Sequence, residues 1–226
     1  AADGDTIAVM NGTYYERIII DKPLILQGES PEGTLIIGSH VGTVANITAD
    51  NVVVTGFSIS GGGMPVSEKD YPAGIGTNGT SNVMISGCRV TDCYIGIYAN
   101  ATTGVTAAEN DLFSNNLTGI EVLNSNLTRI ISNSVHDNFQ GVLLASTDGI
   151  ECSENTLYHN KLNGLYIIDG ISDSLIEDNL FQDNCYVDFD DAGDDSQAGA
   201  YIENIENLTI RNNRFIHNGG LALFLS

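Results

Sequence analysis

The chain has 226 residues, and its hydrophobic content of 42% is enough for one continuous core, which excludes a disordered protein. Its 29 acidic residues outnumber the 8 Lys and Arg residues, and the formal net charge is −21. Such a chain has too few basic side chains to neutralise phosphate, which excludes nucleic acid and anionic membrane surfaces as partners.

The sequence contains no run of 18 apolar residues, so we expect no membrane-spanning helix. It starts at a strand-like segment, residues 6–9, without a charged and then apolar leader, as a processed secreted protein would. We therefore expect a secreted protein of the cell surface or cell envelope.

Six-residue segments recur along the chain, with Asn or a substitute at the first and sixth positions and an apolar residue at the third. The copies occupy residues 88–93, 111–116, 133–138, 155–160, 179–184 and 213–218. Self-similarity at a period of 20–50 residues is the mark of a solenoid.

Short apolar runs flank each copy, such as residues 208–210 before one copy and residues 119–122 after another. These runs have strand character and leave no room for a helix, so each coil holds two or three short strands that pair in parallel with the next coil. The sequence predicts an all-β, single-domain parallel β-helix of roughly nine to ten coils over residues 1–226. One inward row is predicted at Phe113, Val135, Leu157, Phe181 and Phe215, and a second at Ile130, Cys152, Ile176 and Ile210.

The opening segments, residues 4–16 and 18–28, are similar to the first coils of a known group. The chain resembles the right-handed parallel β-helix, pectate-lyase-like superfamily, and especially archaeal cell-surface proteins related to the copper-site maturation factor of nitrous oxide reductase. The resemblance implies a right-handed parallel β-helix, whereas activity depends on sites placed on that fold.

Two insertions interrupt the repeat, near residues 61–73 and 188–198, and long solenoid loops are usually functional or disordered. The second insertion carries carboxylates that could hold calcium, with an acidic solvated loop as the alternative. These candidate ligands are Asp188, Asp190, Asp191, Asp194 and Asp195. No other cofactor is expected, because His40, His136, His159 and His217 are too dispersed for a zinc or copper site and are interpreted as solvated corner residues.

Four cysteines have separate interpretations. Cys88 and Cys93 replace Asn across a predicted turn, where they form either a disulfide or two small ladder side chains. Cys152 is predicted to be a core thiol, and Cys185 to lie at a corner or on an exposed wall.

Asn-x-Ser/Thr sequons make glycosylation a further expectation for a secreted chain. The candidates are Asn11, Asn46, Asn78, Asn100, Asn126 and Asn207. A seventh sequon, at Asn116, is set aside because the repeat places this residue in the ladder.

The sequence indicates no catalytic residue. Polygalacturonase-like hydrolases need a Gly-His-Gly and an Arg-x-Lys motif, and the sequence has neither. Asp190 and Asp191 alone could imitate the paired acids of a glycosidase.

The strands at residues 6–9 and 220–226 have no polar cap, so their edges could recruit another chain. The main prediction is therefore a non-catalytic structural protein that associates with other copies of itself, end to end or side by side, into a surface layer, sheath or filament. The alternative is a carbohydrate-binding or carbohydrate-cleaving β-helix, with a polysaccharide in a groove beside the two insertions.

Overall fold

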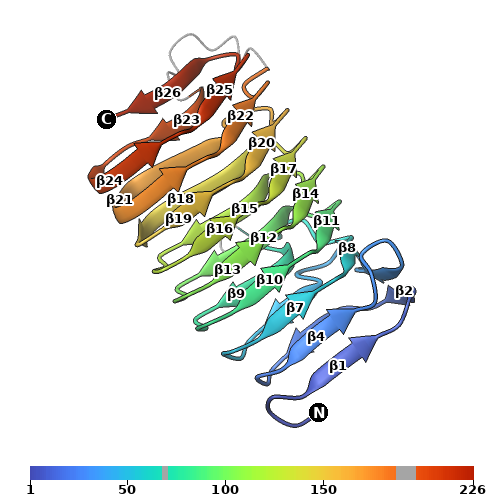
Figure 1. The fold of residues 1–226 in the computed structure, drawn as a ribbon. Coiled ribbons are helices and arrows are strands. Elements are labelled where there is room, and N and C mark those ends of the chain that lie inside the picture. Colours follow the sequence, from blue (N-terminus) through green and yellow to red (C-terminus); the bar gives the residue numbers. More distant parts are fainter. Residues whose placement is uncertain (68–70, 187–196) are drawn as a thin grey trace.

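The computed structural model describes residues 1–67, 71–186 and 197–226. Every regular element in these ranges is a β-strand, which confirms the all-β prediction. The strands stack coil upon coil from the N-terminus to the C-terminus into a parallel solenoid of about nine turns (Figure 1). One hydrophobic core runs through the stack from Ile20 to Ile202.

Each coil contributes strands to three walls. Wall A contains β3 (Ile18–Ile20), β6 (Ala45–Ile47), β9 (Ala73–Asn78), β12 (Ile95–Asn100), β15 (Thr118–Leu123), β18 (Gln140–Asp148), the first half of β21 (Leu165–Glu177), β23 (Ala198–Ile202) and β26 (Leu221–Leu225). Wall B contains β1 (Thr6–Val9), β4 (Ile25–Gly28), β7 (Val53–Thr55), β10 (Met84–Ser86), β13 (Thr106–Ala108), β16 (Arg129–Ile131), β19 (Glu151–Ser153), the second half of β21, and β24 (Ile205–Arg211). Because β21 bends round the corner between them, walls A and B form one 17-stranded sheet.

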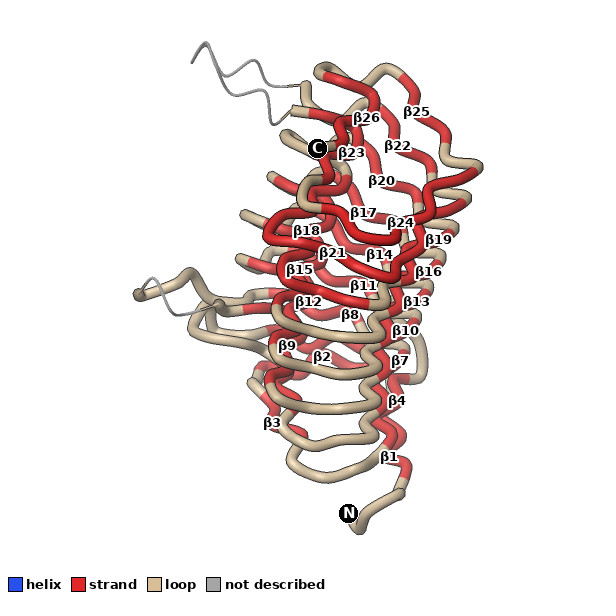
Figure 2. Tube along the Cα trace, turned by 90° about the vertical axis from the view of Figure 1, so that its left-hand side faces the viewer, coloured by secondary structure: helices blue, strands red, loops and turns tan. Residues whose placement is uncertain are grey.

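Wall C is a separate sheet of nine strands. It contains β2 (Gly12–Tyr15), β5 (Thr34–Ile37), β8 (Ser58–Ser60), β11 (Arg89–Thr91), β14 (Asp111–Phe113), β17 (Ser134–His136), β20 (Thr156–Tyr158), β22 (Leu180–Gln182) and β25 (Arg214–Ile216). The two insertions connect wall C to wall A, before β9 and before β23. The described part of the first insertion projects from the side of the stack (Figure 2).

The inward row of wall C differs from the prediction at one residue. Its members include Leu112, Val135, Leu157 and Phe181, whereas Phe113 pairs in register with His136 on the outer face. Leu112 is fully buried and Phe113 is half-buried. The predicted alignment placed segment 111–116 one residue late, and a one-residue slip moves a strand side chain to the opposite face.

The second predicted row is confirmed in wall B. Ile130, Cys152 and Ile176 occupy matching positions in successive coils and are buried, and Ile210 continues the row as a half-buried residue. Cys152 is therefore the core thiol that the sequence predicts.

Two buried asparagine ladders hold the corners on either side of wall C. Asn138 is fully buried. Its Oδ1 accepts two hydrogen bonds from Asn115, one from the backbone N–H at 2.9 Å and one from the side-chain Nδ2 at 3.1 Å. The Nδ2 of Asn138 in turn donates to the carbonyl oxygen of Leu112 at 3.0 Å and to Oδ1 of Asn160 at 3.2 Å. Each ladder amide therefore satisfies backbone groups that a corner would leave unpaired.

Cys88 and Cys93 extend the two ladders by one coil. Their backbone N–H groups donate to Oδ1 of Asn110 and of Asn115 respectively, at 3.0 and 3.2 Å. Both are buried free thiols at opposite ends of β11, so a strand and not a turn lies between them. A strand of this length separates the Cα atoms by more than the ~7 Å that a disulfide can bridge. Of the two interpretations from the sequence, the structure therefore has the second: the pair fills ladder positions, and no disulfide joins them.

Cys185 is also buried, at 4% exposure, which corrects its predicted exposed position. Its backbone φ of 58° confirms the corner, but its Sγ points inward and lies 3.1 Å from the carbonyl oxygen of Ala198. Burial raises the pKa of this thiol to about 12, so it stays protonated.

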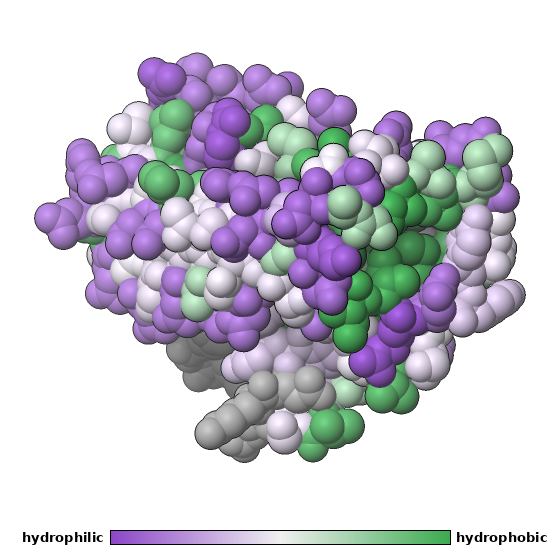
Figure 3. All heavy atoms as spheres, turned by 90° about the horizontal axis from the view of Figure 1, so that it is seen from below, coloured by the Kyte–Doolittle hydropathy of each residue, from purple (hydrophilic) through white to green (hydrophobic). Residues whose placement is uncertain are grey.

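Apolar side chains are exposed on the end of the molecule that the first coil forms (Figure 3). They include Ile7, Met10 and Tyr15. No helix in the described part of the chain is long and apolar enough to cross a membrane.

Candidate functional site

The outer face of wall A carries one row of side chains that crosses all the coils. Its members pair in register and are Ile19, Asn46, Gly76, Tyr98, Glu121, Leu143, Tyr166, Tyr201 and Phe224. We call this set the outer row. Four of its members are aromatic, and near its C-terminal end the rings of Tyr201 and Phe224 stack with centroids 4.5 Å apart.

A recess lies over the outer row where it meets the first insertion. Tyr71, from that insertion, stacks on Tyr98 with ring centroids 5.2 Å apart and planes within 3°. Gly76 leaves the floor beside them without a side chain, and a Cβ at this position would lie 3.1 Å from the methyl group of Thr43. The resulting hollow has a volume of about 270 Å³.

Neutral hydrogen-bonding groups surround this recess. They are the hydroxyls of Thr43, Tyr71 and Tyr98 and the carboxamides of Asn46, Asn78 and Asn100. Burial, followed by the charge of Glu121 and the proximity of Tyr71, raises the pKa of Tyr98 to about 12, so its phenol remains a hydrogen-bond donor.

A second hollow of about 540 Å³ lies beside the recess, toward the N-terminal end of wall A. The two hollows share Thr43 and Asn46, and the second also contacts Arg17, Ile18 and Ile19. The two hollows adjoin each other across Thr43 and Asn46, and we call the pair the groove.

Glu121 follows Tyr98 in the outer row and is almost buried, with 4% exposure. The hydroxyl of Thr118 donates to its Oε2 at 3.3 Å, and burial raises the pKa of the carboxyl from 4.5 to about 7. Gln140 pairs with Thr118 in the next coil, and its buried Nε2 has no hydrogen-bond partner among the residues that the structure describes. Because its pKa lies at about 7, the carboxyl group of Glu121 is about half protonated near neutral pH.

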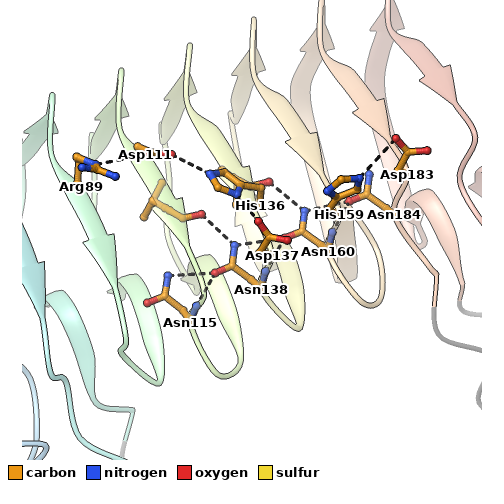
Figure 4. Close-up of polar contacts among 12 residues, drawn as sticks. Arg89, Asp111, Asn115, His136, Asp137, Asn138, His159, Asn160, Asp183 and Asn184 are labelled. Atoms are coloured by element: carbon orange, nitrogen blue, oxygen red, sulfur yellow. Dashed lines mark hydrogen bonds and ion pairs between the residues drawn. The ribbon is translucent and has the colours of Figure 1, made fainter.

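A second polar cluster lies on the outer face of wall C (Figure 4). His136 contacts Asp137 through Nδ1 at 2.7 Å and Asp111 through Nε2 at 3.1 Å, and Arg89 lies 3.4 Å from Asp111. Burial alone would lower the pKa of His136, but hydrogen bonds to both carboxylates outweigh it and raise the pKa. Since both ring nitrogens are engaged and the ring stacks on Tyr158, His136 is held in place and is not free to exchange protons with a ligand.

This cluster corrects the interpretation of the histidines as uniformly solvated corner residues. The side chain of His136 is only 16% exposed and lies on strand β17. His159 and His217 do lie at exposed corners, and both approach Asp183, at 3.7 and 3.8 Å. Within residues 1–67, 71–186 and 197–226, no group of three His, Cys, Asp or Glu side chains could hold a metal ion.

The calcium candidates Asp188, Asp190, Asp191, Asp194 and Asp195 lie outside the described residues, so calcium binding stays a prediction. Three of the predicted sequon residues, Asn46, Asn78 and Asn100, meet in the recess. Asn11, Asn126 and Asn207 are exposed and dispersed. Asn116 is exposed as well, because the ladder residue of its coil is Asn115.

We did not identify the groove residues as a binding site from the sequence, although one feature of the repeat indicates some of them. In the Gly-apolar-x-apolar runs that follow each repeat, the x residue belongs to the outer row, as with Tyr98, Glu121 and Tyr166. The contributions of Tyr71 and Arg17 had no such signal, because they depend on how the first insertion and the first coil pack.

Comparison with known families gives one match. A model of the right-handed β-helix region matches residues 25–181 and again residues 73–226. Among curated protein sequences, none matches this chain.

Solved structures with similar folds include an alginate lyase, an α-1,3-glucanase and an alginate epimerase. An alginate lyase from Paenibacillus superposes with a TM-score of 0.67 at 12% identity, covering 100% of this chain and 92% of the lyase. The catalytic unit of an α-1,3-glucanase from Streptomyces thermodiastaticus gives a TM-score of 0.63 at 15% identity, covering 91% and 42% of the two chains.

A periplasmic alginate epimerase gives a TM-score of 0.61 at 16% identity, with 98% of this chain covered. This chain spans 60% of the epimerase. At such identities the superpositions establish a shared fold and no more.

Proposed function

Because the chain belongs to the right-handed β-helix family, we propose that it binds a polysaccharide in the groove of wall A. The observation that carries this proposal is the recess, in which stacked Tyr71 and Tyr98 stand over the bare floor at Gly76. Aromatic surface combined with a few fixed polar groups is the usual composition of a small-molecule site. A sugar offers both the apolar C–H faces and the hydroxyls that such a recess would accept.

The shape of the groove favours a polymer as the ligand. The residues that line the two adjoining hollows include members of β3, β6, β9 and β12, which follow one another along the solenoid axis. Two adjoining hollows suit two neighbouring sugar units, and the repeating coils offer similar contacts to repeating units. The carboxamides and hydroxyls of the recess carry no formal charge, so the local surface accepts carbohydrate despite the net charge of −21.

The comparisons support carbohydrate as the ligand class. The three similar structures are named for action on alginate or α-1,3-glucan. They favour the carbohydrate alternative over the structural assembly that the sequence analysis put first, for which the comparisons offer no support. One of the three is described as periplasmic, which agrees with the proposed location of this chain outside the cytoplasm.

Carbohydrate cleavage is a second candidate function, and Glu121 is the observation that favours it. A carboxyl group with a raised pKa beside a binding surface is suited to donate a proton. Hydrolysis of a glycosidic bond also needs a second carboxylate about 5–9.5 Å away. Within the described residues no carboxylate lines the recess, and Glu121 lies only beside it in the outer row, so binding is the function that we put first.

Binding can be tested by isothermal titration calorimetry with soluble α-1,3-glucan, a mixed-linkage glucan and alginate. Tyr98→Ala should weaken binding of the best ligand by about tenfold or more, which is ~1.4 kcal/mol or more. Tyr158→Ala is the matched control, because Tyr158 is also a half-buried tyrosine on an outer face but lies on wall C. Equal affinities of the two variants, both folded, would contradict the proposed groove.

A further inference from the structure

We propose that Arg17 forms an anion-binding subsite at the N-terminal end of the groove, which selects polysaccharides that carry a carboxylate or sulfate substituent. The inference rests on the proposed polysaccharide function and adds a determinant of specificity to it. It starts from the charges that line the groove. Arg17 is the only Lys, Arg or His among the residues that line the two hollows.

The guanidinium of Arg17 is oriented by the backbone. Its Nε donates to the carbonyl oxygen of Thr43 at 3.2 Å, which fixes one edge of the group. Gly42, with a φ of 63°, lies against the other side, and a Cβ at Gly42 would be 3.3 Å from Nη2 of Arg17. A side chain at this position would be strained at this φ and would crowd the guanidinium, and glycine avoids both.

The charge of Arg17 is not neutralised by an ion pair within the described residues. Arg89, Arg129 and Arg211 each pair with a carboxylate, whereas Arg17 has no carboxylate oxygen within 4.0 Å. Glu16 borders another hollow beside Arg17, of about 360 Å³, without pairing with it. An oriented guanidinium whose two terminal NH2 groups make no ion pair within the described residues matches the two oxygens of a carboxylate or sulfate.

The position of Arg17 sets where the anion would bind. Thr43 and Asn46 lie between the guanidinium and the recess under Tyr98, so a chain lying in the recess would present its neighbouring sugar unit to Arg17. The two ends of the groove therefore favour different chemical groups on the ligand. The recess accepts neutral hydroxyls, and the Arg17 end requires a negative substituent.

Three matched oligosaccharides test this inference by calorimetry at 0.15 M salt, where the Debye length of ~8 Å screens the net charge of the protein. The first is a mannuronate hexamer, the second is the same hexamer with its carboxylates reduced to alcohols, and the third is the reduced hexamer carrying sulfate esters. Wild-type protein should bind at least one charged hexamer about tenfold more tightly than the reduced hexamer. The first and third hexamers distinguish carboxylate from sulfate.

Arg17→Gln should abolish this preference and leave affinity for the reduced hexamer unchanged. Arg214→Gln is the matched control, since it removes an exposed arginine from wall C and should preserve the preference. Equal binding of all three hexamers by wild type, with loss in Tyr98→Ala, would overturn the anion subsite and leave the polysaccharide groove intact. Binding of none of the three, together with none of the polysaccharides named above, would overturn both proposals.

Discussion

The ring of Tyr71 lies parallel to the ring of Tyr98, with centroids 5.2 Å apart, although one residue belongs to an insertion and the other to the regular coil. This contact joins the first insertion to the outer row of wall A. Without it the floor at Gly76 would be an open surface. The pair therefore converts one part of a repetitive wall into a recess.

Filling that recess should weaken ligand binding without unfolding the protein. Gly76 lies in strand β9 without a positive φ, so the backbone accepts a side chain, and Gly76→Val would place methyl groups against Thr43 and under the tyrosine pair. We expect a loss of about tenfold in polysaccharide affinity, or ~1.4 kcal/mol. Gly12→Ala in wall C should not change affinity, and calorimetry of both variants measures the difference.

The register of wall C can be tested with two phenylalanines. Phe181 is fully buried and stacks on Phe215, so Phe181→Ala should lower the free energy of unfolding by about 3–5 kcal/mol. Phe113 is half-buried on the outer face, so Phe113→Ala should lower the free energy of unfolding by clearly less than Phe181→Ala does. Chemical denaturation of both variants gives the comparison, and equal losses would mean that Phe113 also lies in the core.

The buried ladder should be far more sensitive than its exposed counterpart. Asn138→Ala leaves the backbone N–H of Asn115 and the carbonyl of Leu112 without their partner, at about 1–3 kcal/mol for each unpaired group. Asn124 makes a ladder-like bond to Asn100 at 2.9 Å but is exposed to water. Asn124→Ala should therefore barely move the melting temperature, and a large shift in this control would contradict the argument from burial.

Glu121 should make stability depend on pH. Its pKa is raised from 4.5 to about 7, so the folded protein binds this proton more tightly than the unfolded chain does. Its contribution to the free energy of unfolding is therefore fully present below about pH 4.5 and is lost as the pH rises through about 7. The total loss is ~3 kcal/mol.

Glu121→Gln cannot ionise and should flatten this part of the stability profile, measured by denaturant unfolding between about pH 4.5 and 8. Glu32→Gln, which changes an exposed carboxyl group, is the control and should leave the slope unchanged. A slope that persists in Glu121→Gln would assign the dependence to other groups.

The repeat was sufficient to predict the solenoid, because Asn at fixed spacing and short apolar runs permit few other structures. Copies with Asn at both positions gave the correct register, as Val135 and Phe181 show. The copy at residues 111–116 failed because Asn110, Asn115 and Asn116 allow two alignments that differ by one residue, and the structure places Asn110 and Asn115 in the ladders.

The site was harder to predict for a physical reason. Repetition determines which residues share a row, and a full alignment of the runs that follow each repeat would have placed Tyr98 in one. The recess needs contacts that do not repeat, namely Tyr71 from an insertion and the approach of Arg17 to Thr43. Those contacts depend on tertiary packing, which the local pattern does not encode.

The most direct measurement is a crystal structure of the protein with a bound oligosaccharide of the best-binding polysaccharide. The account predicts sugar units in the groove between Arg17 and Tyr98, with hydroxyls bonded to the carboxamides of Asn46 and Asn78. An oligosaccharide bound instead on the outer face of wall C, over Phe113 and His136, would contradict the assignment of the groove as the binding site.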